Sequence, residues 1–400
     1  MRRERIRAKA GGRPGLCPDS VHRMDAGHTL RAHGLRIGEL DAGPSNSIAD
    51  VAGVGVGHVT VVRDEPEPPA GRGIARTGVT AIAPAPPETL FAEPLAAGVA
   101  VLNGAGELTG AVQIAEWGML ETPIYLTATM SVGRVLDGAV AAAVAADPAV
   151  GVDDVVIPVV GECDDSWLND ARVVQVEAAD AGRALEDASA VAQGAVGAGT
   201  GTGTGAQGAV GAGTGMVCFG FKGGIGSASR LVPELDAVVG ALVLANFGER
   251  RELRIDGVPV GRLLGGRGAR SRPAGSCIVV LATDAPLLSP ALTRVARRAG
   301  LGLARTGSVA HHASGEIFLA VSTSCRQPRE RRGRTAVATI PDGDLDALFA
   351  ATVDATEEAV LNALWSAERT EGRDGRVAEA LPHDAVLELL AAHRRLPSTA

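Results

Sequence analysis

Aromatic residues are scarce in this sequence, and their scarcity limits how a core can be built. Only 3 Trp, 1 Tyr and 6 Phe occur among 400 residues, although 46% of the chain is hydrophobic. Ala, Val and Leu must therefore fill most of the interior, which is large enough for one large α/β domain or two ordinary ones. The 53 glycines indicate many tight turns or close backbone approaches.

Grouped positive charge is also missing. The net charge is −8, and the short Arg clusters at 2–7 and 326–334 lack interleaved aromatic residues. Nucleic-acid binding is not expected, because phosphate contacts need grouped Lys and Arg. We also find no apolar stretch long and uniform enough to span a bilayer, so a membrane partner is not expected.

Cysteines are few and scattered. The chain has five, and no two have the spacing of a metal or redox motif. Reduced, mostly buried thiols in a cytoplasmic protein are therefore predicted. No metal or other cofactor is expected: the adjacent His311 and His312 would face opposite sides of a strand, and the glycine-dense stretch 197–215 lacks the GxxxxGK[ST] phosphate-binding pattern.

Composition divides the chain into an extension and one domain. Residues 1–33 are basic and polar without an apolar segment, which predicts a disordered N-terminal extension rather than a secretory signal. Residues 34–400 are predicted to form a single catalytic domain. The string AQGAVGAGTG starts at Ala192 and again at Ala206, and we expect 194–214 to form a duplicated, flexible Gly/Thr-rich loop.

Short apolar runs alternate with helical patterns through the rest of the chain. Helices outside a pair of apolar sheets, a four-layer α/β/β/α sandwich, are compatible with this mixture. Strands are predicted at 51–62, 78–83, 98–103, 122–127, 155–163, 216–221, 237–246, 277–283 and 316–322, with a turn at 222–226. Helices are predicted at 110–119, 131–146, 181–193, 290–303, 344–368 and 383–393.

The first candidate for chemistry is the bond between Gly275 and Ser276. A loop without a core-forming pattern, 263–275, runs directly into an apolar strand whose first residue is Ser276. Glycine hinders attack at its carbonyl very little, so the serine hydroxyl could attack it, shift the acyl group from nitrogen to oxygen and free an α-amine. That amine, with a pKa near ~7.7, can act as the base for its own hydroxyl. An ordinary serine at a strand start is the alternative.

Three polar residues at strand ends are further candidates. Ser314 and Glu316 stand at positions i and i+2 of a strand, so both face one side and can together orient a nucleophile and relay a proton. Asn246 ends the apolar run GALVLAN, and its amide could donate to an oxyanion. A solvated strand start and a turn asparagine are the respective alternatives.

An acidic group follows the apolar run VVIPVVGE. Glu162 ends this run, and Asp164, Asp165 and Asp170 come after it. A carboxylate at a strand end could hold a substrate ammonium group. The cluster could instead bind a hard cation, or it could be a plain acidic loop.

Together these segments resemble one family, the self-processing β-aminopeptidases and D-aminopeptidase/esterases of the DmpA/BapA type. The resemblance covers about residues 35 to 392. The matching strings are RIGELDAGPSNSIADVAGVGVGHVT (36–60), NGAGELTG (103–110), TPIYLTATMSVGRVLDG (122–138), VVGECDDSWLND (159–170), GAGTGMVCFGFKGGIGSASR (211–230), GSCIVVLATDAPL (275–287), GSVAHHASGEIFLAVST (307–323) and ATEEAVLNAL (355–364).

The resemblance implies an N-terminal-nucleophile-like α/β/β/α sandwich and a precursor cut into an α chain, 1–275, and a β chain, 276–400. It implies homo-oligomers, commonly tetramers of the processed unit, and release of N-terminal residues from small peptides, amides or esters without a metal. Carried onto this chain, Ser276 matches the nucleophile, Ser314 and Glu316 its catalytic partners, and Asn246 the oxyanion-side asparagine. Glu162 matches the carboxylate that meets the substrate amine, and Asp164 lies beside it.

The sequence departs from the family pattern at three places. Asp164 stands where some relatives have a Tyr, and the only Tyr of this chain is Tyr125. Ala105 stands where relatives often have Asn, and the HHASGE string replaces smaller residues. The difference at Asp164 predicts an altered or weaker oxyanion site, and His311 or His312 could reshape the pocket.

Three hypotheses follow. The first is a self-activated serine aminopeptidase acting through an acyl-enzyme on Ser276. The second is an unprocessed ligand-binding or scaffold protein that retains the fold. The third is a nucleotide-dependent enzyme that uses the glycine-rich segments.

Overall fold

Two β-sheets form the centre of the protein. The computed structural model describes residues 29–192, 206–266, 275–330, 332–334 and 336–396. The small sheet has the strand order β1-β2-β5-β6 and the large sheet the order β4-β3-β12-β11-β10-β9. The small sheet comprises β1 (Gly55–Asp64), β2 (Ile74–Ala83), β5 (Ile124–Ala128) and β6 (Val159–Cys163). The large sheet comprises β3 (Leu95–Gly104), β4 (Met119–Leu120), β9 (Gly224–Val232), β10 (Ala237–Asn246), β11 (Gly275–Thr283) and β12 (Ser314–Arg326).

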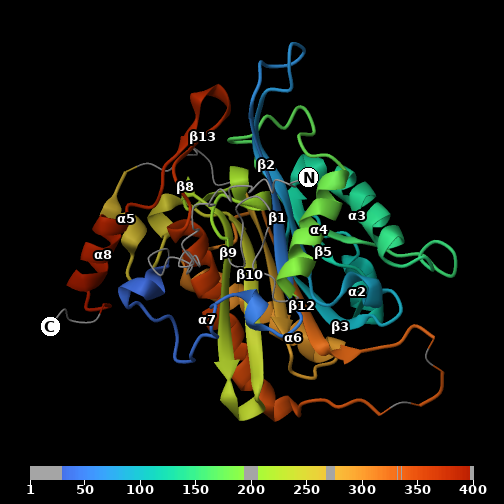
Figure 1. Ribbon diagram of the computed structural model, residues 1–400. Coiled ribbons are helices and arrows are strands. Elements are labelled where there is room, and N and C mark those ends of the chain that lie inside the picture. The colour runs from blue at the N-terminus through green and yellow to red at the C-terminus, as the bar shows by residue number, and fades with distance from the viewer. Residues whose placement is uncertain (1–28, 193–205, 267–274, 331, 335, 397–400) are drawn as a thin grey trace, which may run out of the picture.

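Helices cover the outer face of each sheet, as Figure 1 shows. Helices α3 (Val132–Ala146) and α4 (Ala179–Ala192) pack on the small sheet, and α6 (Ser289–Arg305) and α7 (Leu345–Trp365) pack on the large one. The sheets face each other where β6 lies against β11. The layers therefore run helix, sheet, sheet, helix, which confirms the predicted α/β/β/α sandwich.

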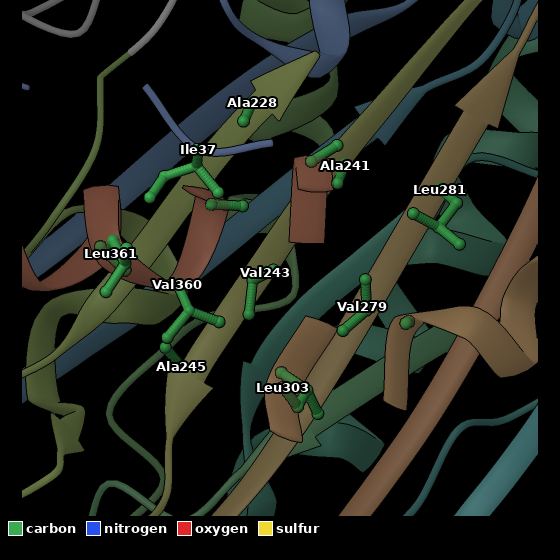
Figure 2. Close-up of a cluster of buried hydrophobic side chains, with 14 of the residues drawn as sticks. Ile37, Ala228, Ala241, Val243, Ala245, Val279, Leu281, Leu303, Val360 and Leu361 are labelled. Carbon is green, nitrogen blue, oxygen red and sulfur yellow. The ribbon is translucent and has the colours of Figure 1, made fainter. Parts of the chain in front are cut away.

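Three clusters of buried side chains fill the three spaces between layers. Val79 and Tyr125 belong to the cluster under α3 and α4, and Ile278 and Leu319 to the cluster between the sheets. In the third, small residues of β9, β10 and β11 meet Leu303 of α6 and Val360 and Leu361 of α7 (Figure 2). Small aliphatic side chains dominate all three, which allows the layers to pack closely despite the lack of aromatics.

The remaining elements are short. The helices are α1 (Pro87–Leu90), α2 (Ala111–Trp117), α5 (Val260–Leu264) and α8 (His383–Ala392). The strands are β7 (Val217–Cys218), β8 (Phe221–Lys222), β13 (Thr370–Glu371) and β14 (Val377–Ala378). Single 3₁₀ turns are η1 (Leu30–His33), η2 (Ile48–Asp50), η3 (Thr129–Ser131), η4 (Gly211–Gly215), η5 (Pro233–Leu235), η6 (Arg250–Glu252), η7 (Asp342–Asp344) and η8 (Arg373–Gly375).

The prediction was wrong around residues 216–232. The expected single strand is the small hairpin of β7 and β8, and the expected turn at 222–226 contains the start of β9. Strand β9 was not predicted because GIGSASR has few residues that favour strands. Its glycines serve packing: a Cβ on Gly226 would overlap the carbonyl oxygen of Ala359 in α7, so α7 can lie this close to β9 only over glycine.

The predicted N-terminal extension ends earlier than residue 33. Residues 1–28 lie outside the described residues, whereas Leu30–His33 forms η1. Leu30 is buried in the core under α7. The Arg31 guanidinium donates to both carboxylate oxygens of Glu358, at 3.0 and 2.9 Å. This apolar anchor and paired hydrogen bond order the segment.

The predicted loop at 194–214 is only partly a loop. Residues 193–205 lie outside the described residues, residues 206–210 are mostly half-buried, and residues 211–214 are buried. Every residue of η4 (Gly211–Gly215) is buried, and the backbone nitrogen of Gly211 donates to Thr60 Oγ1 at 2.8 Å. A Cβ on Gly211 would lie 2.8 Å from His58 Nδ1. The prediction failed because glycine lets a backbone approach neighbouring strands closely, and composition alone does not distinguish that from flexibility.

One helix contradicts the expected absence of a bilayer-length apolar segment. Among the described residues, Thr129–Ala146 is long and apolar enough to cross a membrane by length and composition, with a mean hydropathy of 1.3. Valine and alanine supply most of this hydropathy. The segment contains α3, whose Val135 and Ala139 pack in the core beside the small sheet.

Candidate active site

Strand register brings three of the candidate residues together at one end of the large sheet. Ser276, at the start of β11, pairs with Asn246 at the end of β10 and with Gly315 on β12. The neighbouring Gly275 pairs with Ser314. The β11–β12 pairing is parallel, so the first residues of both strands lie at the same edge, beside the last residue of antiparallel β10. Ser276 is 5% exposed and Asn246 fully buried.

Gly275 lies in a place that admits no side chain. A Cβ there would overlap the carbonyl oxygen of Asn246 and would lie 2.9 Å from Phe247 Cα. Glycine thus allows β11 to begin directly against the end of β10. The carbonyl that precedes Ser276 is unshielded by a side chain of its own.

Ser314 and Glu316 interact directly. The Ser314 hydroxyl donates to Oε1 of Glu316. Burial raises the pKa of Glu316, and the Ser314 hydroxyl, the Asn103 amide and the charge of His311 partly oppose this. A narrow pocket beside the pair is lined by Phe247, Gly248, Gly275, Ser308, His311, Ser314 and Glu316. The pair and the Gly275 backbone therefore face the same small space.

Asn246 is held at both ends of its amide. Its Oδ1 accepts from the backbone nitrogen of Val217 at 2.9 Å, and its Nδ2 donates to the backbone carbonyl of Asp164 at 2.8 Å. These two contacts assign the amide orientation, because only the nitrogen can donate. An amide nitrogen carries two hydrogens, so its position next to Ser276 suits a donor to an oxyanion at that residue.

Glu162 reaches the site from the other sheet. It lies near the end of β6, 3% exposed, and accepts from the Glu107 backbone nitrogen at 3.0 Å and from the Thr129 hydroxyl. A Cβ on Gly106 would lie 3.2 Å from Glu162 Oε1 and 3.7 Å from Gly315 Cα. The carboxylate is therefore separated from the start of β12 by little more than a glycine.

The electrostatic setting of Glu162 favours an added positive charge. Burial raises the pKa of Glu162, the two hydrogen bonds oppose this, and the neighbouring Asp164 and Glu107 raise it further. A substrate ammonium group beside the carboxylate would supply the missing opposite charge and lower the pKa again.

Asp164, which was predicted to join Glu162 in binding substrate, lies directly after β6. Its Oδ1 accepts from the backbone nitrogen of Ser166 at 2.9 Å, and its backbone carbonyl accepts from Asn246. Its charge lies close enough to Glu162 to raise the pKa of that carboxyl. A direct contact of Asp164 with substrate stays a prediction.

Two neighbours of the site were not recognised from the sequence. The Ser276 hydroxyl lies within hydrogen-bonding reach of the Cys163 thiol, whose pKa burial raises strongly. Thr129 donates to Glu162. Both residues lie inside strings matched to the family, VVGECDDSWLND and TPIYLTATMSVGRVLDG, but nothing in those strings indicates which side chains face Ser276 or Glu162.

The alternative chemistries find little support in the described part of the chain. No group of three or more His, Cys, Asp or Glu side chains there is arranged to hold a metal. His311 instead bonds to Glu252, with Nε2 at 3.0 and 3.1 Å from the two carboxylate oxygens. Because η4 (Gly211–Gly215) is buried, its backbone is not open to cradle a phosphate, which overturns the nucleotide hypothesis for these residues.

A four-layer α/β/β/α fold with a buried serine at the start of a central strand defines a hydrolase of the N-terminal nucleophile type. The model of peptidase family S58 matches residues 46–206 and 202–378, and the chain belongs to this family. It is a serine aminopeptidase.

Individual relatives agree with this assignment. The chain is 40% identical over 381 residues to a β-peptidyl aminopeptidase, BapA, from Sphingosinicella microcystinivorans, covering 88% of this chain and 90% of that one. A Burkholderia sp. β-aminopeptidase structure is 40% identical with a TM-score of 0.81, over 91% of this chain and 98% of that one. The L-aminopeptidase D-Ala-esterase/amidase of Ochrobactrum anthropi, a prototype serine aminopeptidase and Ntn-fold variant, is 37% identical with a TM-score of 0.82, over 92% and 99%.

Proposed function

We propose that the chain cleaves itself between Gly275 and Ser276. The Ser276 hydroxyl attacks the Gly275 carbonyl carbon, the peptide nitrogen leaves as an amine, and an ester links the two halves. Water hydrolyses that ester, which yields a Gly275 carboxylate and a Ser276 with a free α-amine and hydroxyl. The side-chain-free approach of Gly275 to Asn246 and the position of Ser276 at the start of β11 support this step. The products are 1–275 and 276–400.

In the mature enzyme, Ser276 attacks the carbonyl carbon of a substrate. Its hydroxyl proton passes to its own α-amine, directly or through Ser314, which Glu316 orients by the hydrogen bond between them. Asn246 donates to the developing oxyanion. The leaving amine or alcohol takes the proton, and water hydrolyses the acyl-enzyme. The one observation that carries this proposal is the register that sets Ser276 beside Asn246 and Gly315.

The substrate class follows from Glu162. A buried carboxylate next to the start of β12 suits a small peptide, amide or ester with a free amino terminus, whose ammonium group it would bind. Relatives act as β-peptidyl aminopeptidases and as an L-aminopeptidase D-Ala-esterase/amidase. We propose β-amino acyl amides as first substrates to assay, with D- and L-α-amino acyl amides and esters beside them.

Glu162→Gln should lower kcat/KM for amides with a free amine by about 10- to 100-fold, because a charge-assisted contact is worth about 1.5–3 kcal/mol. The wild-type KM should rise as pH falls through the raised pKa of Glu162, because the carboxyl group is then neutral. The KM of the variant should not show this rise at low pH. Steady-state kinetics across pH on an amino acyl p-nitroanilide measure both. Glu116→Gln, which alters an exposed carboxylate on α2, is the control. Equal effects in the two variants would contradict the proposal.

We propose that the protein assembles into homo-oligomers, up to a tetramer of processed units. Large apolar side chains are exposed on two neighbouring segments, with Val112 at 86% and Val152 at 80% exposure. Trp117 and Asp154 from the same segments line one open groove. Light scattering should give a multiple of 40.4 kDa, and Val152→Glu should reduce it while Val62→Glu, an exposed valine on β1, should not. A wild-type monomer at working concentration would rule out this assembly.

A cytoplasmic location remains our proposal. All four described cysteines are free and buried, which suits a reducing compartment.

The non-catalytic scaffold alternative requires a wild-type chain that stays intact during long incubation, and the kinetic assay above would then show no turnover.

A further inference from the structure

Lys222, at the end of β8, is completely buried and has its hydrogen bonds fully made. It is 0% exposed, and its ammonium nitrogen lies 3.0 Å from the Gly213 carbonyl, 2.9 Å from the Met216 carbonyl and 2.7 Å from the Gly223 carbonyl. An ammonium group has three donors and no acceptor. Three converging carbonyl oxygens therefore match the protonated amine.

Burying this charge is costly, which calls for an explanation beyond packing. Burial lowers the pKa of Lys222 to about 7, and Cys218 and Asp165 oppose that effect only in part. The three carbonyl oxygens favour the charged form. An apolar side chain of the same length would avoid the cost of desolvation. The contribution of the ammonium group therefore lies in the groups that it holds in place.

The Met216 carbonyl connects Lys222 to the candidate active site. The Met216 carbonyl and the Val217 N–H belong to one planar peptide group. Lys222 and the Gly223 backbone nitrogen, at 3.0 Å, donate to its carbonyl end. Its N–H end donates to Asn246 Oδ1 at 2.9 Å. The ammonium group, one peptide and the Asn246 amide thus form a continuous line of three groups.

We infer that Lys222 is a positioning residue for the oxyanion site, acting through the Met216–Val217 peptide to fix and polarise the amide of Asn246. A cation at the carbonyl end strengthens the N–H end as a donor, and a hydrogen bond to Oδ1 in turn strengthens Nδ2 as a donor. Lys222 touches no reacting atom. The inference rests on the proposed role of Asn246 as oxyanion donor.

A double-mutant cycle tests this inference on the processed enzyme, with kcat and KM measured per active site. Lys222→Met should lower kcat about 10- to 100-fold, as misplaced catalytic groups do, while KM changes less than about twofold. Lys222→Gln, which retains two N–H donors, should recover part of the loss. The combination with Asn246→Ala should be no slower than Asn246→Ala alone, because the lysine acts through that residue.

Arg230 supplies a matched control. Like Lys222, it is a basic residue among the largest fully buried side chains of the described residues. It pairs with Glu358 at 2.5 Å, under α7. Arg230→Met should lower the melting temperature, and its effect on kcat should multiply with that of Asn246→Ala. If Lys222→Met is not processed, the same cycle is carried out with the rate of chain cleavage in place of kcat. If Lys222→Met does not fold, Lys222→Gln takes its place in the cycle.

The outcomes separate the two ideas. If Asn246→Ala is slow but the losses of Lys222→Met and Asn246→Ala multiply, Lys222 is only structural and the inference is overturned. If Asn246→Ala keeps the wild-type kcat, the proposed role of Asn246 fails, and the inference fails with it for that separate reason.

Discussion

Ser276→Ala should leave a single uncut chain of 40.4 kDa with aminopeptidase turnover reduced at least about 10⁴-fold. The variant removes the hydroxyl that would attack Gly275 and the one that would form the acyl-enzyme, while its methyl group fits the 5% exposed site. Wild-type protein should instead give two fragments, and N-terminal sequencing of the smaller one should read SCIVV. Denaturing gels, intact mass and activity follow the change.

A second buried serine controls for loss of folding. Ser322 lies on β12, pairs with Thr283 at the far end of β11, and donates to the Ala285 carbonyl at 2.7 Å. Ser322→Ala should still process and turn over. Active wild-type material with a continuous backbone through Gly275–Ser276 would be incompatible with the proposed nucleophile.

Asn246→Ala should lower kcat by on the order of 100-fold or more, the usual cost of losing one oxyanion donor. It also removes the partners of Val217 and Asp164, so the free energy of unfolding should fall by about 1–3 kcal/mol. Asn246→Asp separates these effects, because an aspartate can still accept from Val217 but brings no N–H donor and adds a negative charge. It should be at least as slow as the alanine variant.

Asn362→Ala is the matched control for the buried amide. Asn362 is fully buried on α7 and donates to the Ser227 carbonyl at 2.9 Å, on the opposite face of the large sheet from the interface between sheets. It should lose stability and keep kcat. Thermal unfolding and kcat measured on the same preparations distinguish the variants, and a wild-type kcat in Asn246→Asp would contradict the oxyanion role.

Local sequence patterns predicted much of the framework. The apolar run after Gly275 predicted β11, and the helical spacing of apolar residues in 344–368 predicted α7 to within a few residues. The i, i+2 spacing of Ser314 and Glu316 predicted that their side chains would meet, and they do. Each of these features is encoded within one element, where periodicity is informative.

Features that depend on distant segments could not be predicted in the same way. The pairing of Ser276 with Asn246 depends on strand order, and the approach of Glu162 depends on how two sheets stack. Gly226 weakens the strand pattern of β9, and it is needed there because α7 packs too close to admit a side chain. The buried η4 (Gly211–Gly215) is predicted as part of a loop for the same reason, because its glycines are required by contacts with neighbouring strands.

The strand order of the large sheet has a consequence for the life of the cut enzyme. Strands β11 and β12 come from 276–400, and they lie between β3 and β10, which come from 1–275. If the chain is cut as proposed, these two strands of the smaller fragment stay between strands of the larger fragment and remain hydrogen-bonded to them on both sides. Neither fragment can dissociate without breaking the hydrogen bonds between strands of the large sheet. Denatured fragments must associate again in a second-order reaction. Maturation would therefore turn a single chain, whose refolding is unimolecular, into a heterodimer of two fragments. The stability of that heterodimer would be kinetic, set by the rate at which the fragments dissociate.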